Sequence, residues 1–219
     1  SYADSLTLGN IYFDAQGDSS TVFIIKVVGN MRVISSSTIS LLNGAMASKI
    51  YWVVTSVAHL GKLVSFKGTL VTNSSLTAGN FVNVEGRLFS LGNVSLANAL
   101  INIPEEAKKA SENIPTDCGC GPRCGTTGPC DPATLAACKS VGMAGGKVSL
   151  HKRSDKPLLR PPPSCGLLTN FTMISAVAIS TVGTTTTGGD IGLYPGTYMS
   201  GDFVYTNGSS LHIGDTLSI

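Results

Sequence analysis

The sequence predicts an all-β protein: an irregular parallel β-solenoid (β-helix-like) with a disulfide-rich, partly helical insert. Three observations support this fold class. Short apolar strands recur and end at Gly or Asn, tight hairpin signals are few, and all six cysteines fall in one Gly- and Pro-rich stretch. Repeated short strands with few hairpins are typical of stacked parallel coils, although an irregular β-sandwich would have a similar pattern.

Composition divides the chain into three zones. Residues 1–103 and 167–219 are rich in Val, Ile, Leu, Ser and Thr, and both have the strand pattern. Residues 104–166 hold every cysteine, most of the prolines and 15 of the 28 charged residues. The outer zones therefore predict an apolar β scaffold, and the middle zone predicts a solvated insert.

Strand-like segments of the first zone include "STVFIIKVVG", "KIYWVVTSV" and "LVSFKGTLVTNSSLTAGNFVNVEGRLFSLGNVSL". The main candidates for type I′ turns are Asn43–Gly44 and Asn207–Gly208, since this turn requires positive φ at both central residues. Trp52 is expected in the core, and "DAQGD" (residues 14–18) as a turn between strands.

The middle zone is predicted to be held by disulfides. An even number of cysteines in a short stretch is typical of an oxidising compartment, and zinc is disfavoured because no Cys-x-x-Cys pair is present. Two short helices are expected, "PEEAKKASEN" and "DPATLAACKS", followed by an extended polyproline segment, "KPLLRPPPSC". The predicted disulfide residues are Cys118, Cys120, Cys124, Cys130, Cys138 and Cys165.

Composition also limits the classes of function. With 42% hydrophobic residues, 13% charged residues and a net charge of +2, the chain is not expected to be disordered or to bind nucleic acid. It has no apolar run of about 20 residues, so no transmembrane segment is expected, and no signal peptide, so a secreted protein would be in its mature form. Four Asn-X-Ser/Thr sequons predict covalent glycans in an extracellular protein, at Asn73, Asn93, Asn170 and Asn207.

No catalytic or metal motif is found. The three histidines, His59, His151 and His212, are scattered, and no His-x-His, His-Glu-x-x-His or Gly-x-Ser-x-Gly pattern occurs. The two carboxylates of "DAQGD" form a poor calcium cage without a bidentate Glu. We therefore predict no enzyme, no metal and no cofactor other than glycans.

Several segments resemble the microbial ice-binding β-solenoid domain of bacteria, fungi and algae. "FDAQGDSSTVFIIKV", "ISLLNGAMASKIYWVV", "FKGTLVTNSSLTAG" and "VEGRLFSLGNVSL" look like the latter part of that domain, in family order. "ISTVGTTTTGGDIGLYPGTY" resembles its opening segment, which here comes last. The two halves of the family domain are thus in permuted order, with the Cys-rich insert at the join.

The resemblance implies a triangular parallel β-solenoid without catalytic activity. Ice binding in that family depends on a flat face of regularly spaced Thr and small residues. The candidate remnant of such a face is Thr184, Thr185, Thr186 and Thr187. A structural role for these β-branched residues is favoured, because no Thr-x-Thr row recurs at coil spacing.

The two ends of the chain carry similar strands, "SLTLGN" at residues 5–10 and "SLHIGD" at residues 210–215. The last segment either folds back on its own chain or completes the next molecule head to tail, which would build a filament. The latter is slightly favoured, because an exposed apolar terminal strand is otherwise an aggregation hazard. The residues of this candidate assembly strand are Leu211, Ile213, Leu217 and Ile219.

The sequence therefore predicts a secreted, non-enzymatic structural glycoprotein that binds copies of itself in an extracellular fibril formed by β-strand exchange. The alternative function is a monomeric module that binds ice or adheres to a surface.

Overall fold

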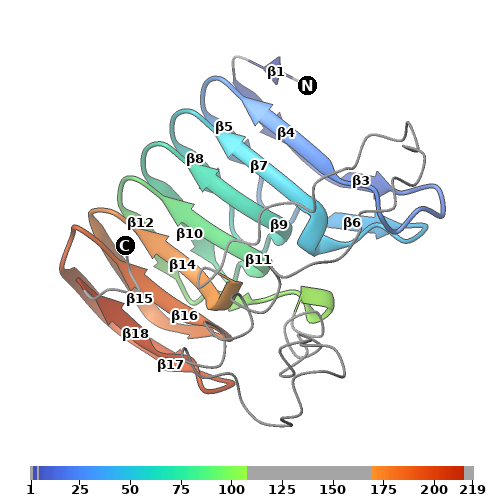
Figure 1. Ribbon diagram of the computed structural model, residues 1–219. Helices are drawn as coiled ribbons and strands as arrows, with labels where there is room; N and C mark the ends of the chain where they lie inside the picture. The colour runs from blue at the N-terminus through green and yellow to red at the C-terminus, as the bar shows by residue number, and fades with distance from the viewer. Residues whose placement is uncertain (1, 4, 108–168, 215–219) are drawn as a thin grey trace, which may run out of the picture. The chain divides into compact units, whose positions relative to one another are not determined.

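The computed structural model describes residues 2–3, 5–107 and 169–214. Residues 1–108 and 165–219 belong to one compact unit, which is the unit considered below. Its strands lie side by side in successive coils, as Figure 1 shows, and every strand pair is parallel. The prediction of an all-β, parallel, solenoid-like fold is confirmed. The predicted disulfides, the two insert helices and the polyproline segment fall almost entirely outside the described residues.

The strands form three faces. Face 1 contains β1 (Tyr2–Ala3), β4 (Phe23–Val27), β7 (Ile50–Val54), the second halves of β9 (Ser65–Thr72) and β11 (Asn83–Ser90), β14 (Phe171–Ser175), β16 (Asp190–Leu193) and β18 (Leu211–Ile213). Face 2 contains β2 (Leu6–Leu8), β5 (Met31–Val33), β8 (Ala58–Leu60), β10 (Leu76–Asn80), β12 (Val94–Ala97) and the first halves of β15 (Ala178–Thr187) and β17 (Tyr198–Tyr205). Face 3 contains β3 (Ile11–Asp14), β6 (Ile39–Leu42), the first halves of β9 and β11, β13 (Leu100–Asn102) and the second halves of β15 and β17. A short 3₁₀ helix, η1 (Ala47–Lys49), precedes β7.

The last zone continues the solenoid begun by the first. Strand β14 pairs with β11 on face 1, and β15 pairs with β12 on face 2 and with β13 on face 3. Strands β16, β17 and β18 then add further out. The last zone therefore packs on its own chain, which is the fold-back arrangement that the sequence pattern slightly disfavoured.

The core is built by the alternation of each strand, which turns every second side chain inward. On face 2 the inward positions of five successive coils form one row whose members are at most 1% exposed: Met31, Ala58, Leu76, Val94 and Ile179. In the first coils the core is aromatic. Trp52 packs edge-on against Phe13 and lies 5.5 Å from Phe66 between ring centroids, so its predicted core position is confirmed.

Buried hydroxyl groups hold the corner between faces 1 and 2. Thr72, Ser90 and Ser175 occupy equivalent positions in neighbouring coils. Each accepts a hydrogen bond from the backbone N–H two residues later, at 3.1, 3.1 and 3.3 Å respectively. Ser90 and Ser175 also donate to a carbonyl of the preceding coil, at 2.6 and 2.8 Å. These bonds give partners to backbone groups that a turn would otherwise leave without one inside the fold.

The two predicted type I′ turns have the expected backbone conformation but form no hairpins. Residues Asn43 and Gly44 have φ of 48° and 86°, and Asn207 and Gly208 have φ of 58° and 71°. Each turn joins segments on different faces, because the strand after it pairs with another coil rather than with the strand before it. Tight turns therefore serve as corners in this fold.

Candidate functional site

The most regular outward feature of the described residues is a row of side chains on face 2, here called the face-2 row. It runs through the middle of every strand of that face, and the strand register places each member directly beside the next. The members are Thr7, Arg32, His59, Thr77, Ser95, Ser180 and Ser200. Its last four members, in four consecutive coils, all carry hydroxyl groups.

Strand pairing fixes the spacing of these hydroxyl groups. Neighbouring strands lie about 4.8 Å apart, so the row repeats at that interval along the solenoid. His59 Nδ1 lies 2.7 Å from Thr77 Oγ1, and Ser180 Oγ donates to Ser95 Oγ at 3.3 Å. The side chains of Thr77, Ser95, Ser180 and Ser200 are half-buried, so this part of the row presents short polar groups. Longer side chains also project from face 2, namely Arg32 in the row itself and Tyr198 in β17, which is 64% exposed.

The other two faces lack such a row in the part of the chain that the structure describes. On face 1 the outward side chains include the bulky Tyr51, Val71 and Phe89. On face 3 Lys67 forms an ion pair with Glu85. Face 2 is thus the part of the described surface best suited to hydrogen-bond a regular array of small polar groups.

The face-2 row is not among the residues predicted from the sequence. The candidate ice-binding residues there are Thr184–Thr187, for which a structural role is favoured, and the structure divides that run by alternation along β15. Thr185 and Thr187 point inward and are fully buried, where their hydroxyl groups contact those of Thr181 and Thr172 at 2.7 and 2.6 Å. Only Thr184 and Thr186 face outward.

Thr186 does not extend into a hydroxyl row on face 3. Its neighbours in register are Leu100 and Val204. The four threonines are therefore not brought together on one exposed surface.

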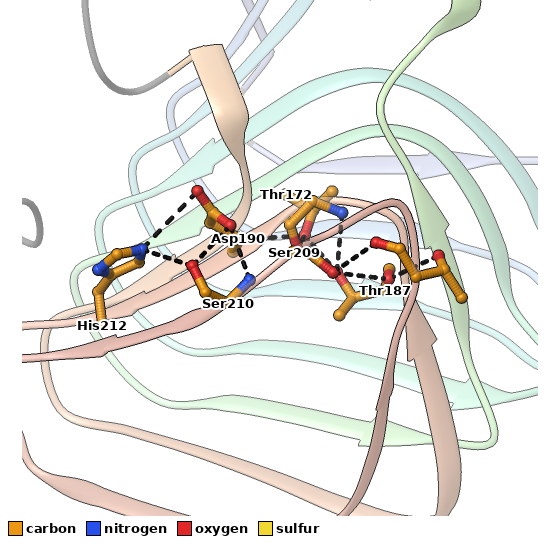
Figure 2. A network of polar contacts seen from close by, with 8 residues as sticks. Thr172, Thr187, Asp190, Ser209, Ser210 and His212 are labelled. Atoms are coloured by element: carbon orange, nitrogen blue, oxygen red, sulfur yellow. Dashed lines mark hydrogen bonds and ion pairs between the residues drawn. The ribbon is translucent and has the colours of Figure 1, made fainter.

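A serine, a histidine and an aspartate meet where β16 and β18 pair (Figure 2). Both the backbone N–H and the hydroxyl of Ser210 donate to Asp190 Oδ1, at 2.8 and 3.1 Å. His212 Nε2 lies 2.9 Å from Ser210 Oγ and 3.7 Å from Asp190 Oδ2. In a catalytic triad the histidine stands between the other two and uses both ring nitrogens. Here one nitrogen faces both partners, so the geometry matches a structural polar cluster and not an activated nucleophile.

The remaining histidines and acidic groups do not converge. His59 lies on face 2 and His212 on face 1, while His151 is outside the described residues. Within residues 2–3, 5–107 and 169–214, no group of three metal-ligating side chains occurs. In the same part of the chain, no helix is long and apolar enough to cross a membrane.

All four sequon asparagines are exposed. Asn73 and Asn93 follow β9 and β11, at the corner between faces 1 and 2. Asn170 and Asn207 precede β14 and β18, at the corner between faces 3 and 1. Among the four, none lies at the corner between faces 2 and 3.

The candidate assembly strand lies partly in β18. Leu211 and Ile213 are 40% and 39% exposed, while Leu217 and Ile219 lie outside the described residues. The two similar end strands are not equivalent in the fold, because β2 lies on face 2 in the first coil and β18 on face 1 in the last. They do not meet within one molecule.

The "DAQGD" segment forms the predicted turn. Hydrogen bonds from the Gln16 backbone N–H and the Asn43 amide to the carboxylate hold the pKa of Asp14 below its ordinary value. Hydrogen bonds from the side chain and backbone of Ser20 likewise lower the pKa of Asp18. The folded chain therefore stabilises the charged form of both carboxylates.

This predicts a loss of stability in acid. A carboxylate whose pKa is lower in the folded state stabilises the fold above its unfolded pKa, and the effect disappears as the pH falls through the folded pKa. We expect the melting temperature of the wild-type protein to fall more between about pH 5 and about pH 2 than that of an Asp14→Ala, Asp18→Ala double variant. Equal pH dependence of the two proteins in calorimetry would contradict this assignment.

Part of this chain is similar to known proteins. Residues 1–102 match the family model described as Ice-binding-like. The chain is 30% identical over 90 residues to the ice-binding protein of Colwellia sp, and the aligned segment covers 41% of this chain and 36% of that protein. It is 33% identical over 88 residues to ice-binding protein 1 of Shewanella frigidimarina (strain NCIMB 400), covering 40% and 10%.

Solved structures give a partial match as well. A crystal structure of an ice binding protein from an Antarctic biological consortium is 33% identical, with a TM-score of 0.46, over 48% of this chain and 47% of that one. The chain spans about a third or less of the length of these curated relatives. The resemblance of residues 167–219 to the opening of the family domain, and hence the permuted order, stays a prediction. Residues 1–102, nearly half of the chain, are thus similar to the ice-binding-like family.

Proposed function

We propose that this protein binds ice through face 2. The observation that carries the proposal is the face-2 row, in which hydroxyl groups of Thr77, Ser95, Ser180 and Ser200 repeat in four consecutive coils. A surface of short, evenly spaced polar groups suits a ligand that is itself a regular array of hydrogen-bonding groups. The names of the relatives, which are ice-binding proteins, support the same ligand.

The experiment blocks this surface without touching the core. In a Thr77→Tyr, Ser95→Tyr variant two bulky side chains would stand out from neighbouring strands of face 2, and the inward residues would be unchanged. We expect the wild-type protein to inhibit ice recrystallisation and to shape ice crystals, and the variant to lose both activities, because the bulky rings prevent close approach of the surface to the ice.

A matched control uses the same chemistry on another face. Ser65 and Asn83 are also register neighbours that point outward, on face 3, so a Ser65→Tyr, Asn83→Tyr variant is expected to retain the activity. Equal loss in both variants would contradict the assignment to face 2. A wild-type protein without effect on ice growth would contradict ice binding itself.

A second candidate function is a structural subunit of an extracellular fibril. The specific observation in its favour is that, within the described residues, the first and last coils have apolar side chains that are only partly buried and strands with one unpaired edge. This fibril function includes secretion and glycosylation at Asn73, Asn93, Asn170 and Asn207. The four asparagine side chains are exposed, as attached glycans require. Electron microscopy of the purified 219-residue chain is expected to show filaments. Monodisperse particles without filaments, at high protein concentration, would contradict the fibril function.

A further inference from the structure

The two ends of the described solenoid differ from its middle in how well they bury their inward side chains. The inward row of face 2 continues past its five buried members to Leu6 in β2 and to Met199 in β17. Both of these residues are only partly buried, although their neighbours in the row, Met31 and Ile179, are at most 1% exposed. Stacked-repeat proteins normally cover such ends with a polar capping unit.

On face 3, the inward side chains at the two ends are also incompletely buried. Ile11 in β3 and Phe203 in β17 are partly buried hydrophobic residues that pack on the core from the two ends. Each end of the described solenoid thus presents an apolar layer. Strands β2 and β3 form the edge of the layer at the first end, and β17 forms the edge of the layer at the last end.

The strands at these ends have one unpaired edge each within the described residues. Strand β17 pairs only with β15, β2 pairs only with β5, and β3 pairs only with β6. Exposed edges are usually protected by Lys, by Pro or by a bulge that interrupts pairing. The eight residues of β17, "YMSGDFVY", contain neither Lys nor Pro, and β2 and β3 contain neither as well.

The two edges are complementary in chain direction and order. Strand β17 runs first along face 2 and then along face 3, and the chain segment β2–β3 follows the same two faces in the same order. A copy whose β2 and β3 lie against β17 of another copy would therefore continue the parallel pairing without a change of direction. Met199 would then cover Leu6, and Ser200 would stand beside Thr7 in an extended face-2 row.

We infer that copies of this chain stack head to tail, with β17 of one copy pairing with β2 and β3 of the next. This deepens the fibril proposal and rests on it. The contact joins two different surfaces, so each added copy presents the same free end and the assembly grows as an open filament. Main-chain hydrogen bonds supply its direction, as in other cases of strand addition to a sheet edge. No exchange of strands is required, because the last zone already packs on its own chain.

A disulfide cross-link tests this register directly. In a Thr7→Cys, Ser200→Cys variant both new thiols point outward on face 2, and the proposed junction places them on neighbouring strands about 4.8 Å apart. That separation lies within the range that a disulfide bridges. On mild oxidation we expect a ladder of covalent dimers, trimers and larger species on a non-reducing gel, which collapses to monomer with reductant.

The matched control moves one thiol by a single coil. Arg32 is the face-2 neighbour of Thr7, so in an Arg32→Cys, Ser200→Cys variant the two thiols would be about 9.6 Å apart across the same junction, beyond the reach of a disulfide. All variants retain the six native cysteines, so a ladder that arises from those would appear in the wild-type protein as well.

A ladder confined to the Thr7→Cys, Ser200→Cys variant supports the junction. Equal ladders in both variants, or none in either, overturn it. If microscopy of the wild-type protein shows filaments while the ladder is missing, the fibril proposal stands and this junction is wrong. If neither filaments nor a ladder form, both are wrong.

Discussion

Replacing Gly86 with alanine is expected to lower the free energy of unfolding by about 3 kcal/mol. Gly86 lies in β11 directly beside Gly68 of β9, where the chain bends from face 3 to face 1. A Cβ atom at position 86 would lie 1.9 Å from the carbonyl oxygen of Gly68. That oxygen is part of the backbone, so it cannot rotate away as the end of a side chain would.

The strain would spread over several coils. Gly68 itself approaches the backbone of Ile50, since a Cβ on Gly68 would lie 2.7 Å from the Ile50 carbonyl oxygen. Moving β9 to make room for the new methyl group at position 86 would therefore press on β7. Gly9→Ala is the control, because the nearest atom there is the Ile34 Cδ1 at 3.7 Å. Denaturant unfolding followed by circular dichroism measures both, and similar midpoints for the two variants would refute the close-approach argument.

Removing the indole of Trp52 is the second large change, with an expected loss of about 3–5 kcal/mol in the free energy of unfolding. The ring is 1% exposed and lies 5.6 Å from the Phe13 ring, between centroids. Its Nε1 donates a hydrogen bond to the carbonyl oxygen of Lys67 at 3.0 Å. Trp52→Ala would thus leave a cavity in the aromatic part of the core and remove the only indole of the chain.

Two further variants separate packing from hydrogen bonding. Trp52→Phe keeps most of the apolar contact and removes the donor, so we expect a smaller loss, with about 1 kcal/mol from the hydrogen bond. Tyr51→Ala changes the preceding residue of the same strand, which faces outward and is 40% exposed, and should have little effect. If Tyr51→Ala destabilised the protein as much as Trp52→Ala, the inward and outward sides of β7 would be wrongly assigned.

Much of the fold follows from local sequence pattern. The strand expected at "KIYWVVTSV" and the core position expected for Trp52 are both confirmed, and the Asn-Gly pairs correctly predict positive φ. What the pattern does not reveal is which strand each segment pairs with, because a turn of a given type can be a corner as well as a hairpin. Parallel pairing depends on the length of a whole coil, which local rules do not determine.

The face-2 row shows why the candidate site was missed. Neighbours in the row are 18 positions apart from His59 to Thr77 but 85 apart from Ser95 to Ser180. A search for a fixed period cannot find such a row. The Thr184–Thr187 run attracted attention because its residues are adjacent, and adjacency in a strand places alternate side chains on opposite sides of the sheet.

The unequal coil lengths have a consequence for how the chain folds. Closing the loop from Ser95 to Ser180 costs about 1.4 kcal/mol more in chain entropy than closing an 18-residue coil, because this cost grows only with the logarithm of loop length. The coils up to β13 form contacts at short range and can assemble first, so they would provide a template for the later strands. The join between β13 and β14 is thus a position where evolution can lengthen or replace the intervening chain at little thermodynamic cost, while the coils on either side remain in register.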